Sequence, residues 1–410
     1  MNILLGEKDF VLATYLVHGQ QDFYKKAEGI AVGLTVGTWT QLPREKQEKM
    51  ARHLGKVFQV KELAPTKDGE PRALLTIGYP LANVTPDFPA LLTTVFGKLS
   101  MDGKIKLVDL QLPDVFLNQF PGPRYGIEGI RKLLGVHDRP LLMSIFKQCI
   151  GLSLDELEEE YQKQIVGGVD LVKDDEIFFR DDHAPVLDRV QAFAQRNRER
   201  EKQTGQKVLY AVNLTGPVTT LVEKARRLVS AGASCLLLNV TPYGLDILQR
   251  LASDPYIDVP IMAHPAFSGA LYASSQYGVS APLWLGKLLR WAGADIVLYP
   301  SPYGSVAMPR EESLQVADYL RDKSIPRPAF PTPSAGIHPG LVPVLYRDFG
   351  QDLIVNAGGG VHGHPYGSTA GARAFKAAID AAIQGRSLDD AAQDDPDLQA
   401  AVDQWGVAAV

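Results

Sequence analysis

The segment GGVDLVKDDE, residues 167–176, places a lysine and three carboxylates where an apolar run ends. Because side chains alternate along a strand, Lys173 and Asp175 are expected on one face and Asp174 on the other. Glu176, at the end of the run, can turn back toward the first face. Two carboxylates on one side suit a hard cation such as Mg²⁺, which prefers oxygen ligands in octahedral geometry.

Lys173 fits such a metal site only in a modified form, because an ammonium group cannot be a metal ligand. An uncharged amine that takes up CO₂ becomes a carbamate, which supplies a third oxygen anion beside Asp175 and Glu176. The alternative is a solvated acidic turn in which the lysine forms a surface ion pair of low energetic worth. The context of the segment has to decide between the two interpretations.

Composition places the chain among soluble globular proteins. Its 410 residues suffice for two domains, with 45% hydrophobic and 22% charged residues. A formal net charge of −5 gives no support to nucleic-acid or anionic-membrane binding. No apolar run approaches the length of a membrane span, and the start of the chain lacks the pattern of a signal peptide. Cys149 and Cys235 show neither disulfide nor metal spacing, so a cytoplasmic protein is expected.

Residues 1–134 predict a small α+β domain. The order of its elements, strand-helix-strand-strand-helix-strand, suggests a ferredoxin-like fold. The segment Pro121-Gly122-Pro123 interrupts regular structure, and a short helix is expected over 127–134. These features place the domain boundary near Gly135. The strands are expected over 10–18, 56–63, 72–79 and 104–110, and the helices over 25–36 and 88–99.

From residue 135 to residue 410 the pattern becomes a strict alternation of strands and helices. About eight such units in some 250 residues are typical of a TIM (β/α)₈ barrel. A doubly wound open sheet is the structural alternative, but no G-x-G-x-x-G follows the first strand. A helical tail after residue 387 is expected to pack against the barrel. The strands are expected over 140–146, 169–173, 208–214, 235–240, 260–263, 295–299, 328–331 and 353–356.

Polar groups stand at nearly every expected strand end, where the chemistry of a TIM barrel gathers. Such regular placement on otherwise apolar strands is hard to obtain by accident, so it favours a metal site over an acidic turn. The strand ends carry Lys147, then Lys173 with Asp175 and Glu176, then Asn213, Asn239, His264, Ser301, Ser334 and Gly358-Gly359-Gly360.

Glycines after the last two strands predict a phosphate site. Gly358 and Gly359 precede a helix, and barrels often hold a phosphate there on bare backbone N–H groups. A tight turn without a ligand is the alternative. Ser334 and Gly336, after the seventh strand, can add a hydroxyl and further N–H donors beside it.

Two more strand-end residues are candidates for substrate contact. Lys147 can polarise a carbonyl or move a proton at the barrel mouth, although a solvated rim lysine would look the same. His264 is expected to face the metal and the phosphate, which favours substrate contact over a purely structural role. No histidine has a convincing zinc spacing.

The segment 167–176 resembles the activation motif of the RuBisCO large-chain family, whose lysine is carbamylated and whose last two acids bind Mg²⁺. The likeness covers almost the whole chain. TVGTWT at 35–40 resembles the family's N-domain phosphate contact, and Lys147 before GLS resembles its strand-one lysine. SAGIH at 334–338 and GGG at 358–360 resemble its last two loops.

The resemblance implies roles for residues that no pattern in the chain assigns by itself. It implies that carbamylated Lys173, Asp175 and Glu176 hold Mg²⁺, and that Thr38 and Trp39 contact the substrate. It also implies a homodimer in which the N-terminal domain of one subunit closes the barrel mouth of its partner.

The chain departs from the carboxylating members of that family at both ends of the substrate. Their mobile loop after the sixth strand carries a lysine, which residues 301–308 lack, and the glutamate that pairs with it corresponds to Gly33. The arginine after the strand-five histidine corresponds to Pro265, and the strand-six histidine to about Leu298. A bisphosphate would leave charge unpaired there, so one phosphate and an apolar tail are implied.

The resemblance therefore implies a RuBisCO-like enolase of methionine salvage, which converts 2,3-diketo-5-methylthiopentyl 1-phosphate to 2-hydroxy-3-keto-5-methylthiopentenyl 1-phosphate. Lys98, in FGKLS, would be the general base, and that role requires an uncharged amine, which burial or nearby cations would favour by lowering its pKa. On sequence alone Lys98 could also be a helix-end lysine. Lys147 would orient the substrate. The alternatives are another RuBisCO-like isomerase of a methylthio sugar phosphate, a ribulose-bisphosphate carboxylase, and a non-enzymatic sugar-phosphate sensor.

Overall fold

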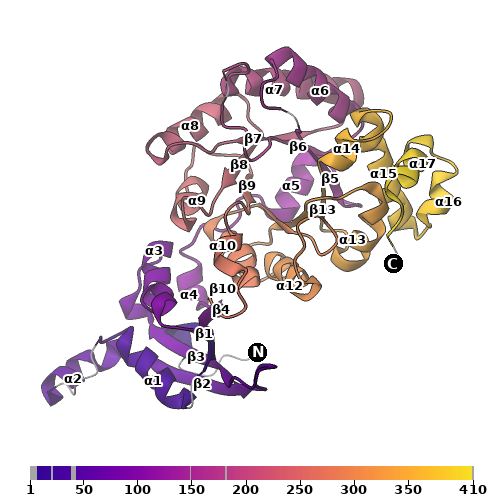
Figure 1. The fold of residues 1–410 in the computed structure, drawn as a ribbon. Helices are drawn as coiled ribbons and strands as arrows, with labels where there is room; N and C mark the ends of the chain where they lie inside the picture. Colours follow the sequence, from indigo (N-terminus) through magenta and orange to yellow (C-terminus); the bar gives the residue numbers. More distant parts are fainter. Residues whose placement is uncertain (1–6, 20–21, 38–42, 148, 181, 409–410) are drawn as a thin grey trace.

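The computed structural model describes residues 7–19, 22–37, 43–147, 149–180 and 182–408, and its strands form two sheets (Figure 1). A five-stranded sheet lies in the N-terminal part, and an eight-stranded parallel sheet forms the barrel. The predicted combination of a ferredoxin-like domain and a TIM barrel is thereby confirmed. Thr38 and Trp39 lie outside the described residues.

The N-terminal sheet has the strand order β10-β4-β1-β3-β2, with β1 antiparallel to both β3 and β4. Leaving β10 aside, this is the order of a ferredoxin-like fold. The strands are β1 (Phe10–His18), β2 (Lys56–Leu63), β3 (Arg72–Pro80) and β4 (Ile105–Gln111). The helices are α1 (Phe23–Gly33), α2 (Arg44–Met50), α3 (Phe88–Leu92) and α4 (Asp114–Leu117).

The single helix expected over residues 88–99 is wrong in detail. The chain forms α3, then a π-helical turn, η4 (Thr93–Gly97), then a 3₁₀ turn, η5 (Leu99–Met101). Two β-branched threonines and a glycine have low helix propensity, which helps to explain why the α-helix does not continue. Lys98 stands at the junction of the two turns, and π-turns are frequent at functional sites.

The barrel strands follow one another in space, in the order β12-β11-β9-β8-β7-β6-β5-β13, and every neighbouring pair in this order is parallel. Their positions agree with the expected strands to within two residues at each end, except that β12 ends three residues later than expected. The strands are β5 (Leu141–Ile145), β6 (Leu171–Lys173), β7 (Leu209–Asn213), β8 (Cys235–Asn239), β9 (Ile261–His264), β11 (Ile296–Pro300), β12 (Phe330–Ser334) and β13 (Ile354–Ala357).

The ring is completed between β12 and β13 by packing rather than by a described backbone ladder. The backbone groups of Phe330 and Ser334 form hydrogen bonds with the β11 side. Because successive residues of a strand direct their backbone groups to opposite sides, those of Pro331 and Pro333 face β13. Because proline has no N–H, these positions cannot donate to a ladder. A side-chain hydrogen bond from Asn356 Nδ2 to Ser334 Oγ, 2.7 Å long, joins the two strands instead.

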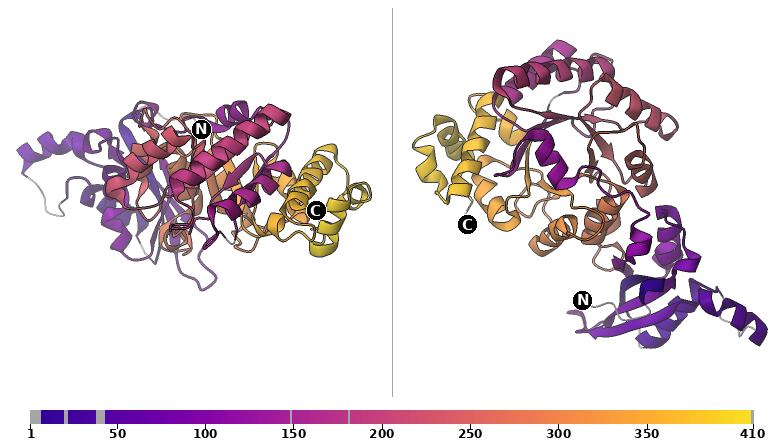
Figure 2. Two further views of the ribbon diagram at one scale, coloured as in Figure 1. Left: turned by 90° about the horizontal axis from the view of Figure 1, so that it is seen from above. Right: turned by 180° about the vertical axis from the view of Figure 1, so that it is seen from behind.

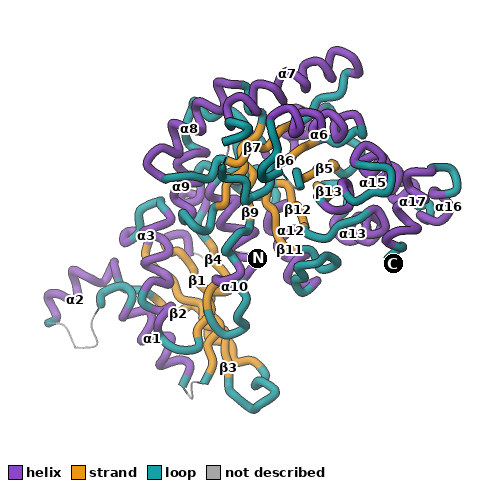
Figure 3. Tube along the Cα trace, turned by 45° about the horizontal axis from the view of Figure 1, so that its top comes forward, coloured by secondary structure: helices purple, strands orange, loops and turns teal. Residues whose placement is uncertain are grey.

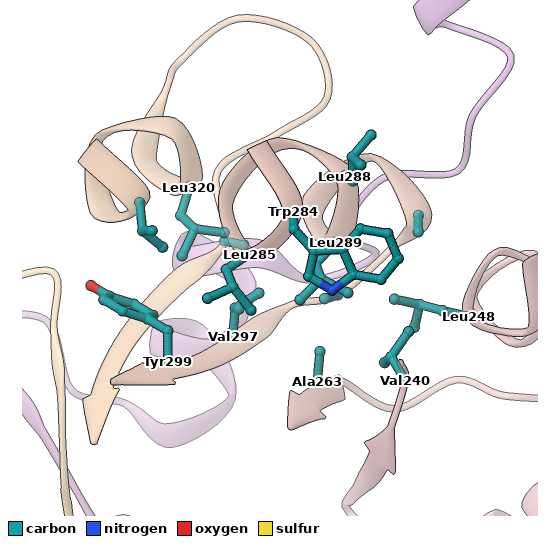
Figure 4. Close-up of a cluster of buried hydrophobic side chains, with 14 of the residues drawn as sticks. Val240, Leu248, Ala263, Trp284, Leu285, Leu288, Leu289, Val297, Tyr299 and Leu320 are labelled. Atoms are coloured by element: carbon teal, nitrogen blue, oxygen red, sulfur yellow. The ribbon is translucent and has the colours of Figure 1, made fainter. Parts of the chain in front are cut away.

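Helices cover the outside of the barrel, and their apolar faces fill the layer between helices and strands. Figure 4 shows part of this layer, in which Trp284, Leu285 and Leu289 pack over Val297 and Ala263. The helices are α6 (Leu154–Val166), α7 (Val186–Thr204), α8 (Val218–Ala231), α9 (Leu245–Ala252), the π-helix η6 (Pro282–Leu288) with α11 (Leu289–Ala292), α12 (Arg310–Arg321), α13 (Val342–Phe349) and α15 (Ser368–Gln384).

Both ends of the barrel segment carry extra helices. Helix α5 (Gly126–Leu134) packs Ile127, Ile130 and Leu134 against the inner side chains of the strands, so it plugs the end of the barrel where the strands begin. The expected tail helices are α16 (Leu388–Ala392) and α17 (Pro396–Trp405), which lie beside α15 (Figure 2). The division at residue 135 stays a prediction.

One short strand joins the two parts of the chain. β10 (Gly278–Val279) comes from the barrel segment and pairs in parallel with β4 of the N-terminal sheet. Lys106 of β4 donates from Nζ to the carbonyl oxygens of Tyr272 and Ser274, at 3.0 and 2.5 Å. Figure 3 shows the N-terminal sheet beside the barrel at this contact. Among the described helices, none is long and apolar enough to cross a membrane.

Candidate active site

Alternation along the barrel strands brings the polar strand ends to one mouth. The inner core contains Leu171, Ala211, Leu237 and Met262. The residue two positions further along each strand shares that inward face. These residues, from β6, β7, β8 and β9, are Lys173, Asn213, Asn239 and His264.

Lys173 is enclosed by protein, with a side chain that is 0% exposed. Its Nζ donates to the carbonyl oxygen of Asp174 at 2.8 Å and lies 3.4 Å from Glu176 Oε2. Burial lowers the pKa of Lys173 from its ordinary value, aided by the charge of Lys147 and opposed by Glu176 and Asp175. Burial thus favours the uncharged amine, the form that reacts with CO₂.

The two carboxylates of the predicted metal site both face cationic or donor groups. Asp175 Oδ2 accepts from Lys147 Nζ at 2.7 Å, and Glu176 Oε2 lies 3.4 Å from His264 Nε2. Burial and the nearby lysines hold the pKa of His264 well below its usual range, although Asp175 opposes them. His264 Nδ1 accepts from the backbone N–H of Ala266 at 3.2 Å, so the remaining proton of the neutral ring is assigned to Nε2, facing Glu176.

Asp174 points away from this cluster, as alternation predicts. Its Oδ2 pairs with Arg189 Nη2 at 2.9 Å and accepts from the backbone N–H of Asn213 at 2.9 Å. Its Oδ1 accepts from Tyr210 Oη at 2.6 Å. The carboxylate is fully buried, so this network anchors the end of β6 to α7 and β7. Strict alternation predicts a helix after β6 but gave it no bounds, so Arg189 was not identified as the partner of Asp174.

We predict that Asp174→Ala destabilises the protein by roughly 3–5 kcal/mol, because it leaves the Arg189 charge buried without its partner. Urea unfolding followed by circular dichroism measures the change. The matched control is Asp182→Ala, which removes an exposed ion pair with Arg180 of similar length, 2.8 Å. That variant is expected to change stability by less than about 0.5 kcal/mol. Equal destabilisation in both variants would contradict the anchoring role.

Two asparagines hold the loop that follows β6. Asn213 Nδ2 donates to the carbonyl oxygens of Asp175, Glu176 and Phe178, at 3.2–3.4 Å. Asn239 Nδ2 donates to the Glu176 carbonyl at 3.0 Å, while its Oδ1 is buried without a protein partner. Both residues stand at predicted strand ends, but sequence reasoning assigned them no role. They orient the backbone that carries the two carboxylates.

The donor set fits Mg²⁺ if Lys173 is carbamylated. No three His, Cys, Asp or Glu side chains gather as a metal site in the part of the chain that the structure describes. Asp175 and Glu176 would supply two carboxylates, and the carbamate of the enclosed Lys173, whose Nζ lies 3.4 Å from Glu176 Oε2, would supply a third oxygen anion. The Lys147 amine lies 2.7 Å from Asp175 Oδ2, so both carboxylates face positive or potentially positive groups.

The glycine-rich loop after β13 adjoins Lys147. An added Cβ on Gly358 would lie 2.8 Å from Lys147 Cε, so the glycine leaves room for the lysine chain. Gly359 begins the short helix α14 (Gly359–His362), and no described hydrogen bond is donated by the N–H groups of Gly359 and Gly360, whereas those of Val361 and His362 bond to the Gly358 carbonyl oxygen. This arrangement brings the predicted phosphate loop and Lys147 together.

We predict that Gly358→Ala lowers kcat/KM by roughly tenfold or more, because the new methyl group displaces the Lys147 amine from Asp175. The backbone at Gly358 has φ −110°, which alanine tolerates, so stability should change little. Steady-state kinetics in a double-mutant cycle with Lys147→Ala provides the measurement. If Gly358→Ala is equally damaging without the Lys147 side chain, the explanation is wrong.

The loop after β12 presents a second set of backbone donors. Ala335 and Gly336 have φ of 76° and 70°, and no described hydrogen bond is donated by their N–H groups. Ser334 Oγ donates to the carbonyl oxygen of Thr332 at 2.8 Å. The N–H groups are therefore available to an anion, whereas the Ser334 hydroxyl proton already has an acceptor.

The two residues assigned to the apolar end of the mouth are both largely shielded from solvent. Leu298 is 1% exposed and packs in the inner core. It follows Val297, which pairs with Ala263 of β9, so it lies level with His264. Pro265 is half-buried after β9. That these residues accommodate an apolar tail stays a prediction.

Lys98 is not part of this cluster within one chain. It is exposed, and it lines a cavity of about 90 Å³ with other N-terminal residues, among them Gly33, Lys26 and Asp102. Lys26 Nζ pairs with Asp102 Oδ2 at 2.7 Å. The burial expected for a general base is therefore absent in the single chain.

Comparison with known proteins decides the family. The model of the ribulose bisphosphate carboxylase large chain, catalytic domain, matches residues 126–307 and 307–405. The model of the N-terminal domain of the same chain matches residues 4–116. The chain belongs to the RuBisCO large-chain family. The resemblance inferred from the 167–176 motif is confirmed.

Individual relatives match nearly the whole chain. A 2,3-diketo-5-methylthiopentyl-1-phosphate enolase of Geobacillus kaustophilus (strain HTA426) is 56% identical over 408 residues, covering 98% of this chain and 99% of that protein. An enolase of the same name from Bacillus velezensis is 54% identical over 396 residues, covering 97% and 98%. These identities group the chain with the RuBisCO-like enolases within the family.

Solved structures show the same fold. A rubisco-like protein (MtnW) of Alicyclobacillus acidocaldarius has a TM-score of 0.92 at 52% identity, covering 97% of this chain and 100% of that one. An octameric ribulose-1,5-bisphosphate carboxylase/oxygenase of Pyrococcus horikoshii has a TM-score of 0.88 at 32% identity, covering 98% and 95%. A Rubisco of Hyperthermus butylicus, described as dimeric, has a TM-score of 0.85 at 31% identity, covering 98% and 97%.

Proposed function

We propose that the chain is an isomerase that converts 2,3-diketo-5-methylthiopentyl 1-phosphate to its enol, 2-hydroxy-3-keto-5-methylthiopentenyl 1-phosphate, in methionine salvage. The observation that carries the proposal is the buried Lys173 amine facing Asp175 and Glu176 at the barrel mouth. Relatives that align over 98% of the chain bear the name of this enolase.

Mg²⁺ is the proposed metal, held by the Lys173 carbamate, Asp175 and Glu176. When bound, it supplies a positive charge that stabilises the enolate form of the diketone. Asn213 and Asn239 keep the two carboxylates in place through the loop backbone. The substrate is a small phosphate ester, and no polyanion or membrane is required.

The proton moves from the carbon that bears the phosphate ester to Lys98 Nζ. The bonding pair of that C–H bond forms the new carbon-carbon double bond, and the oxygen on carbon 2 gains a proton to give the enol. Lys147 orients the reacting carbonyl groups from its position between Asp175 and Gly358. The N–H groups of Gly336, Gly358 and Gly359 hold the phosphate, with Ser334 beside them and His264 contacting the substrate from β9.

Lys98 reaches the cluster from a partner subunit in this proposal. The support is that Lys98 is exposed in its own chain and shares a cavity only with N-terminal residues. A base must be uncharged to accept a proton, and docking against a barrel mouth would provide the missing burial. The active unit is then a homodimer. Thr38 and Trp39 would contact the substrate from the same partner domain.

Carboxylation is disfavoured by the same residues. No lysine occurs in the loop over 301–308, and Gly33 stands beside Lys98 in place of a glutamate. Both members of the lysine–glutamate pair expected in a carboxylating enzyme are therefore missing.

The test uses the purified protein with Mg²⁺, bicarbonate and the diketo phosphate, and it follows the conjugated enol by ultraviolet absorbance. We expect enol formation that is lost in Lys98→Ala. No enol with wild-type protein would overturn the proposal, and the isomerase of a methylthio sugar phosphate would then be assayed by nuclear magnetic resonance of the product.

A further inference from the structure

The loop after β11, residues 301–308, is fastened to the neighbouring β-α unit by a buried carboxylate. Tyr303 Oη donates a hydrogen bond to Asp348 Oδ2 at the end of α13, and the Asp348 side chain is only 1% exposed. Arg310 donates to both oxygens of Asp348, each at 2.8 Å, and Arg347 Nε donates to Oδ1 at 2.9 Å. We refer to these four residues as the Asp348 cluster.

The acceptor in this cluster remains charged. The two guanidinium groups and the Tyr303 hydroxyl hold the pKa of the Asp348 carboxyl well below its usual range. A hydrogen bond to an enclosed carboxylate is stronger than one between neutral groups. The Tyr303 hydroxyl is therefore a firm attachment point for a loop whose other residues at 305–307 are exposed.

The same loop touches the proposed phosphate loop after β12. Ser305 N–H donates to the Ala335 carbonyl oxygen at 3.2 Å. An added Cβ on Gly304 would lie 1.7 Å from that oxygen, and one on Gly336 would lie 2.6 Å from Ser305 N. The two backbones meet where both residues are glycine, so neither loop can shift independently of the other.

Ala335 shows why the phosphate loop needs this support. Its φ of 76° is left-handed, which an L-residue with a Cβ adopts only when its surroundings enforce the conformation. The contact with Ser305 is one such constraint. The β11 loop thus helps to hold the backbone of Ala335 and Gly336, whose N–H groups have no described acceptor.

We propose that Tyr303 is a positioning residue that holds the β11 loop against residues 334–337, and so fixes the phosphate-binding N–H groups throughout turnover. The proposal deepens the proposed function and rests on it for the identity of the phosphate ester. Tyr303 itself contacts no reacting atom. Loss of the Tyr303 hydroxyl should therefore weaken substrate binding more than it slows the chemical step.

The variant that tests this inference is Tyr303→Phe, which removes one hydroxyl and leaves both arginines paired with Asp348. The matched control is Tyr346→Phe on the same helix as Asp348. We expect KM for the diketo phosphate and Kd for inorganic phosphate to rise by roughly three- to tenfold, which is less than the full contribution of one hydrogen bond to a charged group, because only part of that energy is expressed in phosphate binding. We expect kcat to change by less than about twofold, because the phosphate is bound equally in the ground state and in the transition state.

Hydrogen exchange provides a readout that does not depend on turnover. Peptides covering 301–308 and 334–337 should exchange their amide hydrogens faster in Tyr303→Phe than in wild type or Tyr346→Phe. All three proteins should have the same melting temperature. Unchanged exchange and unchanged phosphate affinity would overturn the inference. If the wild-type protein forms no enol but exchange still rises only in Tyr303→Phe, the fastening stands and the enolase proposal fails.

Discussion

Lys173→Gln is expected to abolish enol formation, with a loss of roughly a thousandfold or more in kcat/KM. Lys173 is the only source of a third anion beside Asp175 and Glu176 in the described cluster, and glutamine cannot form a carbamate. The fold should survive, because replacing a buried amine by a neutral group also removes the cost of burying its charge.

Calorimetric titration with Mg²⁺, in the presence and absence of bicarbonate, separates the metal site from turnover. Wild-type protein should bind Mg²⁺ more tightly with bicarbonate, whereas Lys173→Gln should show no bicarbonate effect. Lys202→Gln, an exposed position on α7, is the matched control and should behave as wild type. Bicarbonate-dependent binding in Lys173→Gln would refute the carbamate.

The pH dependence of this activation follows from the same burial. The pKa of Lys173 is lowered from 10.5, and only the uncharged amine reacts with CO₂. At a fixed concentration of dissolved CO₂, Mg²⁺ binding should therefore rise with pH, and its midpoint should lie below 10.5.

Lys98→Ala is the second change with a large expected effect, a loss of roughly a hundredfold or more, because proton abstraction loses its base. The more informative experiment pairs it with Lys173→Gln. Two differently tagged chains, one carrying each substitution, are produced together, and the mixed dimers are purified through both tags.

Each mixed dimer tests whether the site is shared between subunits. If Lys98 acts in trans, one of its two sites combines an intact N-terminal domain with an intact barrel, so the dimer should keep about half of the wild-type activity. If Lys98 acts within its own chain, both sites are damaged and the mixed dimer should be as inactive as its parents. Homodimers of each variant are the controls.

Much of the fold follows from patterns that repeat locally. Buried parallel strands appear in the sequence as short apolar runs. Because side chains alternate between the two faces of a strand, Lys173 is predicted to face inward and Asp174 outward, as the structure shows. Most strand ends could be placed to within two residues because the apolar run stops at a polar residue, whereas β12 continues through Thr332 and Pro333 and ends three residues later than expected. Pro331 and Pro333 of β12 are visible in the sequence, but their effect on the pairing with β13 could be interpreted only once the neighbours of β12 were known.

The parts that could not be predicted depend on contacts between distant segments. Helix α7 is strongly polar, and its few buried residues give only a weak helical periodicity of apolar side chains. Its bounds were therefore not predicted, and Arg189 was not identified as the partner of Asp174. The low helix propensity of Thr93, Thr94 and Gly97 indicates that the α-helix is weak before Lys98, but it does not indicate that the chain forms a π-turn there. Tyr303 and Asp348 lie 45 residues apart, and no local pattern links a loop tyrosine to a helix-end carboxylate.

The pairing of β10 with β4 affects the order in which the protein can be completed during synthesis. When the N-terminal sheet leaves the ribosome, the edge of Ile105–Gln111 has unpaired N–H and C=O groups, and Lys106 lacks the carbonyl groups of Tyr272 and Ser274. Residues 272–279, which supply these carbonyl groups and β10, are synthesised only after about half of the barrel. The nascent N-terminal sheet therefore carries an open edge that a chaperone or a second nascent chain can occupy.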